Sequence, residues 1–179
     1  MENIYLETDE FLLCPADKPE VLKGLRLTED LFNLLSDKET LRYLPEKHIS
    51  SVQEAEQWLC TTLLNIHCGR NQTHLIISRN SRRLIGIIDI IPPLVAKEYY
   101  RLGDYPYFIE FYLRRSVTGN SLMSNLLPKV VQLLKDNGIN SIAAVVHRQN
   151  SAACKVLRRS GFQKEQWFDL NQDLYSLSA

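Results

Sequence analysis

The sequence has no excess of charge of one sign, no long hydrophobic run and no closely paired cysteines. Lysine plus arginine and aspartate plus glutamate number 21 each among 179 residues, so the formal net charge is zero. Domains that bind duplex nucleic acid usually carry a basic excess, so we expect no nucleic-acid partner. No apolar run approaches the roughly 18 residues that a membrane-spanning helix needs, so we expect no membrane partner.

The start of the chain and its cysteines indicate a cytoplasmic protein without a metal. The first eight residues carry Glu2 and Glu7 and lack the basic-then-apolar pattern of a signal peptide. The cysteines are Cys14, Cys60, Cys68 and Cys154. Their spacing, together with that of His67 and His74, does not fit the common zinc patterns. We therefore expect reduced structural thiols and no metal site.

Length, composition and hydrophobic periodicity predict one α/β (α+β) domain over residues 1–179. Hydrophobic residues make up 45% and charged residues 23%, as in ordinary globular proteins. Short apolar segments bounded by turn residues predict strands, and segments with apolar residues at helical spacing predict helices. The strands are expected at 7–15, 73–78, 84–91, 107–113, 141–146, 164–169 and 173–177, and the helices at 28–36, 51–68, 122–137 and 152–159. We read residues 94–106 as a loop, and Thr28 as the N-cap of the first helix.

The segment 107–146 reads as strand, helix and strand, so its two strands should be parallel. Between the first strand and the helix lies Arg114-Arg115-Ser116-Val117-Thr118-Gly119-Asn120-Ser121. Free backbone N–H groups at such a helix start can bind phosphate, and the two arginines add positive charge. An ordinary turn is the alternative. The glycines of a dinucleotide-binding fingerprint and the Gly-Lys-Ser/Thr of a P-loop are both missing.

Two further residues affect the helices. Asn150 follows a strand and begins a short helix, so it is a natural N-cap. Pro128 lies about two turns into the helix at 122–137. Its ring removes one backbone hydrogen bond, so we expect a kink near Ser124.

Four short motifs occur in order along nearly the whole chain. They are Glu7-Thr8 with Leu12-Leu13-Cys14-Pro15; Leu35-Ser36-Asp37 with Arg42-Tyr43-Leu44; Ser51, Glu54-Ala55 and Trp58-Leu59; and Asn150, Ala153, Val156-Leu157 and Gly161-Phe162. Together they resemble the GNAT superfamily of N-acetyltransferases, in particular the branch that contains the ribosomal-protein N-terminal acetyltransferases. The resemblance implies a mixed, mostly antiparallel twisted sheet of about seven strands. It also implies a central splayed parallel pair and helices on both faces.

The resemblance implies acetyl-coenzyme A (acetyl-CoA) as the co-substrate. Its pantetheine arm would pair with the end of the strand at 107–113, that is, with Phe111, Tyr112 and Leu113. The family's pyrophosphate loop is Gln/Arg-x-x-Gly-x-Gly/Ala, which corresponds here to Ser116, Val117, Thr118, Gly119, Asn120 and Ser121. The glycine is in place, whereas the first and last positions differ from the family pattern. Asn150, from the C-terminal motif, is the remaining candidate for cofactor binding.

The implied chemistry needs a base, because only a neutral amine can attack the acetyl group. Glu110 is the first candidate, since a partly buried carboxylate on that strand could accept a proton. His147 titrates near neutrality and is the second. Tyr107 and Tyr112 are candidate proton donors, because Leu157 stands where many family members have a tyrosine acid. The structural alternatives are that Glu110 pairs with a neighbouring Arg or Tyr and that His147 is merely solvated.

The resemblance implies transfer of an acetyl group to a primary amine, either a protein N-terminus or a small molecule. Tyr99, Tyr100, Asp104 and Tyr105 could bind a cationic amine, or their loop could merely cover a hairpin. One alternative function is a catalytically weak or inactive GNAT-fold module that binds acyl-CoA. Another is a structural protein that binds no cofactor. We expect a monomer or a homodimer.

Overall fold

The computed structural model describes residues 4–18 and 23–178, which form two compact units. One unit comprises the described residues up to 89 together with 111–118, and the other comprises 90–110 and 119–178. Strand β5 (Tyr107–Leu113) contributes to both units. The expectation of one domain stays a prediction, because compactness alone does not say whether the units unfold together.

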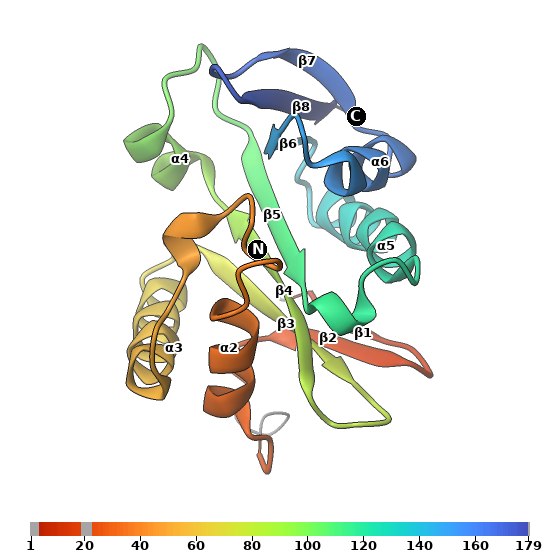
Figure 1. Cartoon of the computed structure of the whole chain (residues 1–179). Coiled ribbons are helices and arrows are strands. Elements are labelled where there is room, and N and C mark those ends of the chain that lie inside the picture. Colours follow the sequence, from red (N-terminus) through yellow and green to blue (C-terminus); the bar gives the residue numbers. More distant parts are fainter. Residues whose placement is uncertain (1–3, 19–22, 179) are drawn as a thin grey trace. The chain divides into compact units, whose positions relative to one another are not determined.

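The strands form an eight-stranded sheet in the order β1-β2-β3-β4-β5-β6-β8-β7 (Figure 1). They are β1 (Leu6–Glu7), β2 (Phe11–Pro15), β3 (Gln72–Ser78), β4 (Leu84–Ile91), β5 (Tyr107–Leu113), β6 (Ser141–His147), β7 (Gln163–Trp167) and β8 (Gln172–Ser178). The β5–β6 pair is parallel, whereas β1–β2, β2–β3, β6–β8 and β7–β8 are antiparallel. The expected mixed, mostly antiparallel sheet with a central parallel pair is confirmed.

The expected opening strand at 7–15 is two strands, which raises the strand number to eight. The Thr8 N–H donates to Phe11 O at 3.0 Å, and the Thr8 hydroxyl donates to Phe11 O and accepts from Phe11 N–H, each at 3.1 Å. These contacts close a tight turn at Asp9-Glu10, so the chain reverses there. The side chain of Thr8 therefore makes the turn that the hydrophobic pattern does not reveal.

The first unit contains α2 (Leu27–Leu35), the short 3-10 helix η1 (Pro45–Lys47) and α3 (Val52–His67). The predicted N-cap at Thr28 is wrong, because α2 begins at Leu27 after Arg26, which makes no side-chain capping bond. For α3 the capping box is confirmed. The Ser51 hydroxyl accepts the Glu54 N–H at 3.1 Å, and the Glu54 carboxylate accepts the Ser50 N–H at 2.8 Å.

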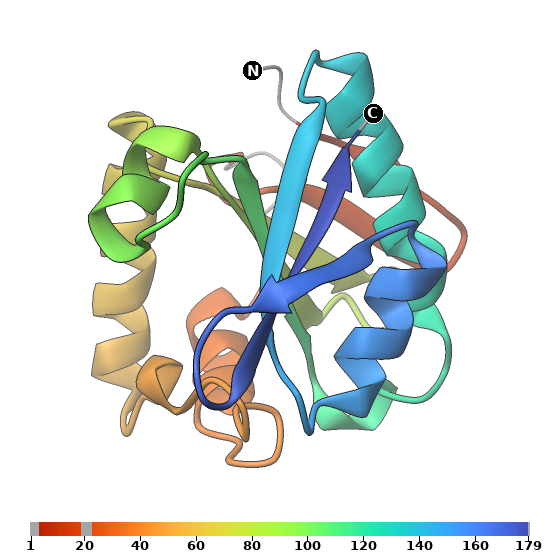
Figure 2. The same cartoon turned by 90° about the horizontal axis from the view of Figure 1, so that it is seen from above.

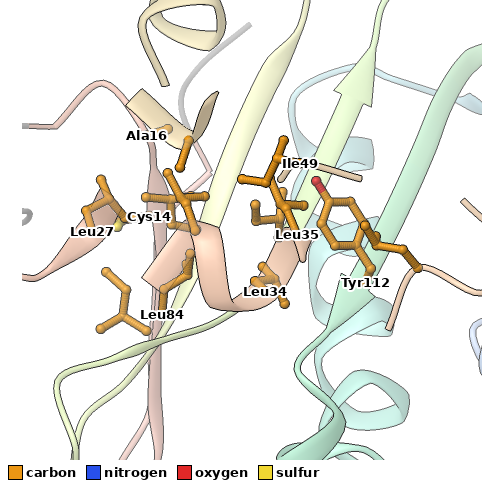
Figure 3. Close-up of a cluster of buried hydrophobic side chains, with 14 residues drawn as sticks. Cys14, Ala16, Leu27, Leu34, Leu35, Ile49, Leu84 and Tyr112 are labelled. Atoms are coloured by element: carbon orange, nitrogen blue, oxygen red, sulfur yellow. The ribbon is translucent and has the colours of Figure 1, made fainter. Parts of the chain in front are cut away.

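A buried hydrophobic cluster joins α2 and α3 to β2, β3, β4 and β5 (Figure 3). In Figure 3 the ring of Tyr112 lies beside Leu35 and Ile49. Trp58 of α3 is half-buried against the same cluster. The buried members of the cluster are Cys14, Ala16, Leu27, Leu31, Leu34, Leu35, Leu41, Ile49, Ala55, Leu75, Ile77, Leu84, Ile87 and Tyr112.

The second unit contains α4 (Pro93–Tyr99), α5 (Leu122–Asp136) and α6 (Ser151–Arg159). Within this unit, α4 lies on one side of β6 and β8, and α5 and α6 lie on the other (Figures 1 and 2). The loop expected at 94–106 is wrong over its first part, because residues 93–99 are helical. Pro93 stands at the start of α4, where its fixed φ favours a helix, and no side-chain cap marks this start.

Aromatic and ionic contacts hold the second unit together. The Tyr100 ring lies 4.6 Å from the Phe108 ring and 5.3 Å from the Phe168 ring. Arg148 donates to the Asp173 carboxylate at 2.7 Å, and its guanidinium lies 4.7 Å from the centre of the exposed Trp167 ring.

Among the described residues, no helix is long and apolar enough to cross a membrane.

Candidate active site

Strand β5 pairs with β6 over only two residue pairs, Tyr107 with Ile142 and Phe108 with Ala143. Strand β6 pairs with β8 along its whole length to His147. The later residues of β5 lie beyond the parallel pairing, as the splayed pair predicts. Phe111 and Leu113 are half-buried. Their backbone groups are the ones that the family resemblance assigns to the pantetheine arm.

The end of β5 approaches β4 closely at Gly86. A Cβ atom added to Gly86 would lie 2.8 Å from the carbonyl oxygen of Tyr112 and would also meet the Leu113 side chain. Such distances are too short for any real side chain, so only glycine permits this approach. The sequence shows Gly86 inside a strand, which is a sign of close backbone contact, but its partner cannot be read from the sequence.

The junction after β5 forms a short 3-10 turn and then two left-handed residues. Arg114 N–H donates to Ile85 O at 2.8 Å, and η2 (Arg115–Val117) follows. Gly119 has φ +84° and Ser121 has φ +59°, both in the left-handed region. A serine rarely adopts this conformation, whereas glycine adopts it freely. Ser121 therefore holds a backbone conformation that is unfavourable for a residue with a Cβ atom.

Helix α5 begins directly after Ser121, and no side-chain hydrogen bond caps it. Its first backbone bond runs from Asn125 N–H to Ser121 O at 3.0 Å. Ser116, Thr118, Gly119, Asn120 and Ser121 are exposed, and Val117 is half-buried. A helix start of this kind presents N–H groups that can hold phosphate oxygens.

Arg114 does not supply the free positive charge that the sequence suggests for this junction. Its guanidinium lies 3.2 Å from the carboxylate of Asp30, which is fully buried in α2. Arg83 approaches the same carboxylate at 2.5 Å, and Leu84 N–H donates to it at 3.0 Å. Arg115 is exposed and supplies the positive charge at this junction. Asp30 was missed from the sequence, where it resembles an ordinary acidic residue in a first helical turn.

The candidate catalytic residues lie in different settings. Glu110 is half-buried on β5, and Tyr112 is 5% exposed in the buried cluster. His147 ends β6, and its Nδ1 accepts the Gln149 N–H at 3.2 Å. Their catalytic roles stay predictions.

Asn150 follows His147 closely, because its N–H donates to His147 O at 2.8 Å. Its side-chain oxygen accepts the Ala153 N–H at 3.1 Å, so the predicted N-cap of α6 is confirmed. Its contact with a cofactor stays a prediction. Leu157 is fully buried and carries no proton to donate.

The tyrosines of the segment 94–106 divide between interior and surface. The Tyr105 hydroxyl donates to Tyr100 O at 3.0 Å, and the Lys97 ammonium lies 5.5 Å from the Tyr105 ring centre. Tyr99 and Asp104 are exposed. Tyr100 and Tyr105 thus stabilise the segment, which leaves Tyr99 and Asp104 accessible to a ligand. No metal-binding group of three or more His, Cys, Asp or Glu residues occurs in the described part of the chain.

Solved structures share this fold over nearly the whole chain. The RimL ribosomal L7/L12 alpha-N-protein acetyltransferase in complex with coenzyme A superposes with a TM-score of 0.72 at 20% identity, covering 99% of this chain and 98% of that one. The acetyl transferase from Salmonella typhimurium that modifies the N-terminal serine of ribosomal protein L7/L12 gives 0.68 at 18% identity, covering 96% of each chain.

The microcin C7 self-immunity acetyltransferase MccE, in complex with acetyl-CoA and AMP, gives a TM-score of 0.69 at 16% identity, covering 96% of this chain and 94% of that one. At such identities the similarity shows the fold alone.

No curated protein sequence matches the chain. The model of the acetyltransferase (GNAT) domain family matches residues 22–163, which is most of the chain. Because this match includes β5, the junction after it and α5, the chain belongs to the GNAT acetyltransferase family, and it is an acyltransferase.

Proposed function

We propose that this enzyme transfers the acetyl group of acetyl-CoA to a primary amine by direct attack of the amine on the thioester. The observation that carries the proposal is the junction between β5 and α5. The backbone of Gly119 and Ser121 lies in the left-handed region, and the helix start that follows has no side-chain cap. Backbone N–H groups of this kind suit the pyrophosphate of a coenzyme A. RimL with coenzyme A and MccE with acetyl-CoA support the same co-substrate.

The pyrophosphate would be held by main-chain amides rather than by long side chains. The exposed segment from Ser116 to Ser121 offers those amides, and Arg115 adds positive charge beside it. Phe111, Tyr112 and Leu113 offer strand backbone to the pantetheine arm. Asn150, as the cap of α6, is the remaining cofactor contact that we propose.

The reaction forms a C–N bond and breaks the thioester C–S bond. The acceptor must lose a proton before or during attack, and we assign that proton to the carboxylate of Glu110. His147 is the second candidate for this role. The leaving thiolate takes up a proton, for which Tyr112 is the candidate donor.

A second function, acyl-CoA binding without turnover, is favoured by one observation. Leu157 occupies the place where many family members carry a tyrosine acid, and it is fully buried. The two functions make the same prediction for cofactor binding and opposite predictions for thiol release.

The loop is tested with Asn120→Glu, which adds a negative charge at an exposed position, and with Asn120→Gln as the matched control. Isothermal titration calorimetry should show that coenzyme A binds about tenfold more weakly to Asn120→Glu and normally to Asn120→Gln. A saturating ligand should also raise the free energy of unfolding by about 2.7 kcal/mol at a hundred times its dissociation constant.

Binding of coenzyme A by the wild type, with thiol release in the presence of an amine panel, supports the transferase. Binding without thiol release for any amine selects the second function. Absence of binding at millimolar coenzyme A contradicts both.

For the acceptor we propose an amine on a protein N-terminus or on a small molecule. The Salmonella typhimurium neighbour modifies an N-terminal serine, which supports the first class. We further propose that the enzyme acts in the cytoplasm. Its four cysteines are free thiols, as is typical of a reducing compartment. Fractionation of cells with an antibody against the chain tests this location.

A further inference from the structure

Strand β4 carries one buried carboxylate among seven apolar or glycine residues. Asp89 is 6% exposed. The Thr73 hydroxyl, from β3, donates to its Oδ1 at 2.5 Å, and the Asn71 side-chain amide donates to the Thr73 hydroxyl at 3.2 Å. These contacts fix the carboxylate and occupy one of its two oxygens. The strand pattern alone would favour an apolar residue here, so a charge at this position calls for a ligand or a partner.

The partner is an ammonium group. Lys47 Nζ lies 3.9 Å from Asp89 Oδ2 and 5.6 Å from the centre of the Tyr112 ring, and the Lys47 side chain is 23% exposed. A carboxylate and an aromatic face are the two features that attract a primary ammonium ion. Asp89 and Tyr112 therefore form a small receptor that holds the side chain of the chain's own lysine.

The two sides of this receptor differ in how firmly they are held. Asp89 and Tyr112 lie on strands of the sheet, and Tyr112 belongs to the buried cluster. Lys47 comes from η1, a three-residue turn between α2 and α3, and it has a long flexible stem. The two strands therefore fix the carboxylate and the ring independently of where the lysine side chain lies.

The contact between Lys47 and Asp89 is also a long one. The distance of 3.9 Å to Oδ2 is longer than a hydrogen bond. Burial raises the pKa of Asp89, and the opposing effects of Lys47 and Thr73 do not cancel it. An ammonium ion that approached within hydrogen-bond distance would stabilise the charged carboxylate better than Lys47 does.

We propose that Asp89 and Tyr112 bind the ammonium group of the acceptor, and that Lys47 occupies this position until the acceptor displaces it. This inference rests on the proposed transferase function and names its substrate class. The acceptor carries a primary ammonium on an unbranched alkyl chain, like the lysine that it replaces. Asp89 and Tyr112 act here as specificity residues.

The test measures binding of n-butylammonium to the protein without acetyl-CoA, with n-butanol as the uncharged control. Lys47→Met keeps the length of the stem and removes the competing charge, so it should bind n-butylammonium about tenfold more tightly than the wild type. Asp89→Asn should bind it at least about tenfold more weakly. Asp173→Asn, which changes another buried strand aspartate with a lysine partner, is the matched control and should bind normally.

Tighter binding by Lys47→Met together with loss in Asp89→Asn supports the proposal. Unchanged or weaker binding by Lys47→Met overturns it, and this variant does not depend on the fold tolerating Asp89→Asn. Coenzyme A affinity is measured for every variant. If the wild type binds coenzyme A and none of the variants changes amine binding, the inference fails and the proposed function stands. If the wild type does not bind coenzyme A, the proposed function fails.

Two probes distinguish the sources of such an ammonium group. One is a short peptide with a blocked N-terminus and a single lysine, and the other is 1,4-diaminobutane. Binding of either, strengthened in Lys47→Met, supports the proposal and identifies the source. A peptide with a free N-terminus and no lysine that alone gains affinity in Lys47→Met overturns the unbranched-chain class.

Discussion

Asp30 lies in the first turn of α2, where a carboxylate would ordinarily face solvent and interact with the helix dipole. In the structure it is fully buried and accepts hydrogen bonds from Leu84 N–H, Arg83 and Arg114. Arg114 is 84 positions away along the chain. One side chain thus ties α2 to the beginning of β4 and to the end of β5.

Asp30→Asn should lower the free energy of unfolding by about 3 kcal/mol, because it leaves two guanidinium groups beside a neutral amide. Urea denaturation measures this loss. Arg83→Gln is the comparison, and it should cost much less because the Arg83 side chain is 36% exposed and Arg114 still balances the carboxylate. Equal denaturation midpoints for wild type and Asp30→Asn would contradict the assignment.

Glu110→Gln should lower kcat by about a hundredfold if Glu110 is the base, because the amide cannot accept the proton of the acceptor. Coenzyme A affinity should not change. Thiol-release kinetics measure kcat, and Glu165→Gln, an exposed glutamate of β7, serves as the control. An unchanged rate from about pH 6 to pH 9 would exclude Glu110 as the base and would leave His147 as the candidate.

At the scale of elements, the junction before α5 depends on an unusual serine. Ser121 has φ +59°, a conformation that costs a residue with a Cβ atom about 1 kcal/mol. Ser121→Gly should therefore raise the free energy of unfolding by up to about 1 kcal/mol. Ser121→Ala, which keeps the Cβ atom, should bring no gain. Thermal unfolding followed by circular dichroism compares the two, and a gain in Ser121→Ala alone would refute the strain argument.

The boundaries of four of the eight strands could be predicted from apolar runs that end at turn residues. Strand β5 has the predicted bounds, and β3, β4 and β6 differ from prediction by at most one residue at an end. These are long apolar runs between turn residues, for which local pattern and tertiary burial agree. The start of α4 and the turn at Thr8 could not be predicted in this way. Each depends on one proline or one hydroxyl rather than on a repeated pattern.

The candidate site was less accessible to prediction than the fold. The position of the loop around Gly119 follows from a glycine between a strand and a helix, and both the residue and its place are visible in the sequence. The engagement of Arg114 by Asp30 and the pairing of Lys47 with Asp89 are contacts between distant segments. Neither contact leaves a local sequence pattern, so only the folded chain reveals them.

At the scale of the whole molecule, one buried histidine links stability to pH. His74 is 1% exposed, and its Nδ1 donates to Gln72 O at 3.2 Å. Its Nε2 is buried without a hydrogen-bond partner among the described residues. Burial lowers the pKa of His74 from 6.5 to about 4, because the charged ring is poorly solvated there.

The unfolded chain therefore binds a proton at His74 between about pH 6.5 and pH 4, whereas the folded chain does not. Stability should be complete above pH 6.5 and should fall by about 3 kcal/mol as the pH approaches 4. Urea denaturation across this range, compared with His74→Leu, isolates the contribution, since the carboxylates titrate in both proteins. If the free energy of unfolding changed equally with pH in the two proteins, His74 would not be the cause.

The two tryptophans are divided between the two compact units: Trp58 lies in the first and Trp167 in the second. Trp58→Phe and Trp167→Phe each leave one fluorophore, so emission spectra report on one unit at a time. If the chain is a single domain, both variants should give coincident unfolding curves in urea and in heat, apart from a shift caused by the substitution itself. Separate transitions would instead show that the two units unfold independently. Urea could then unfold one unit while the other stays folded.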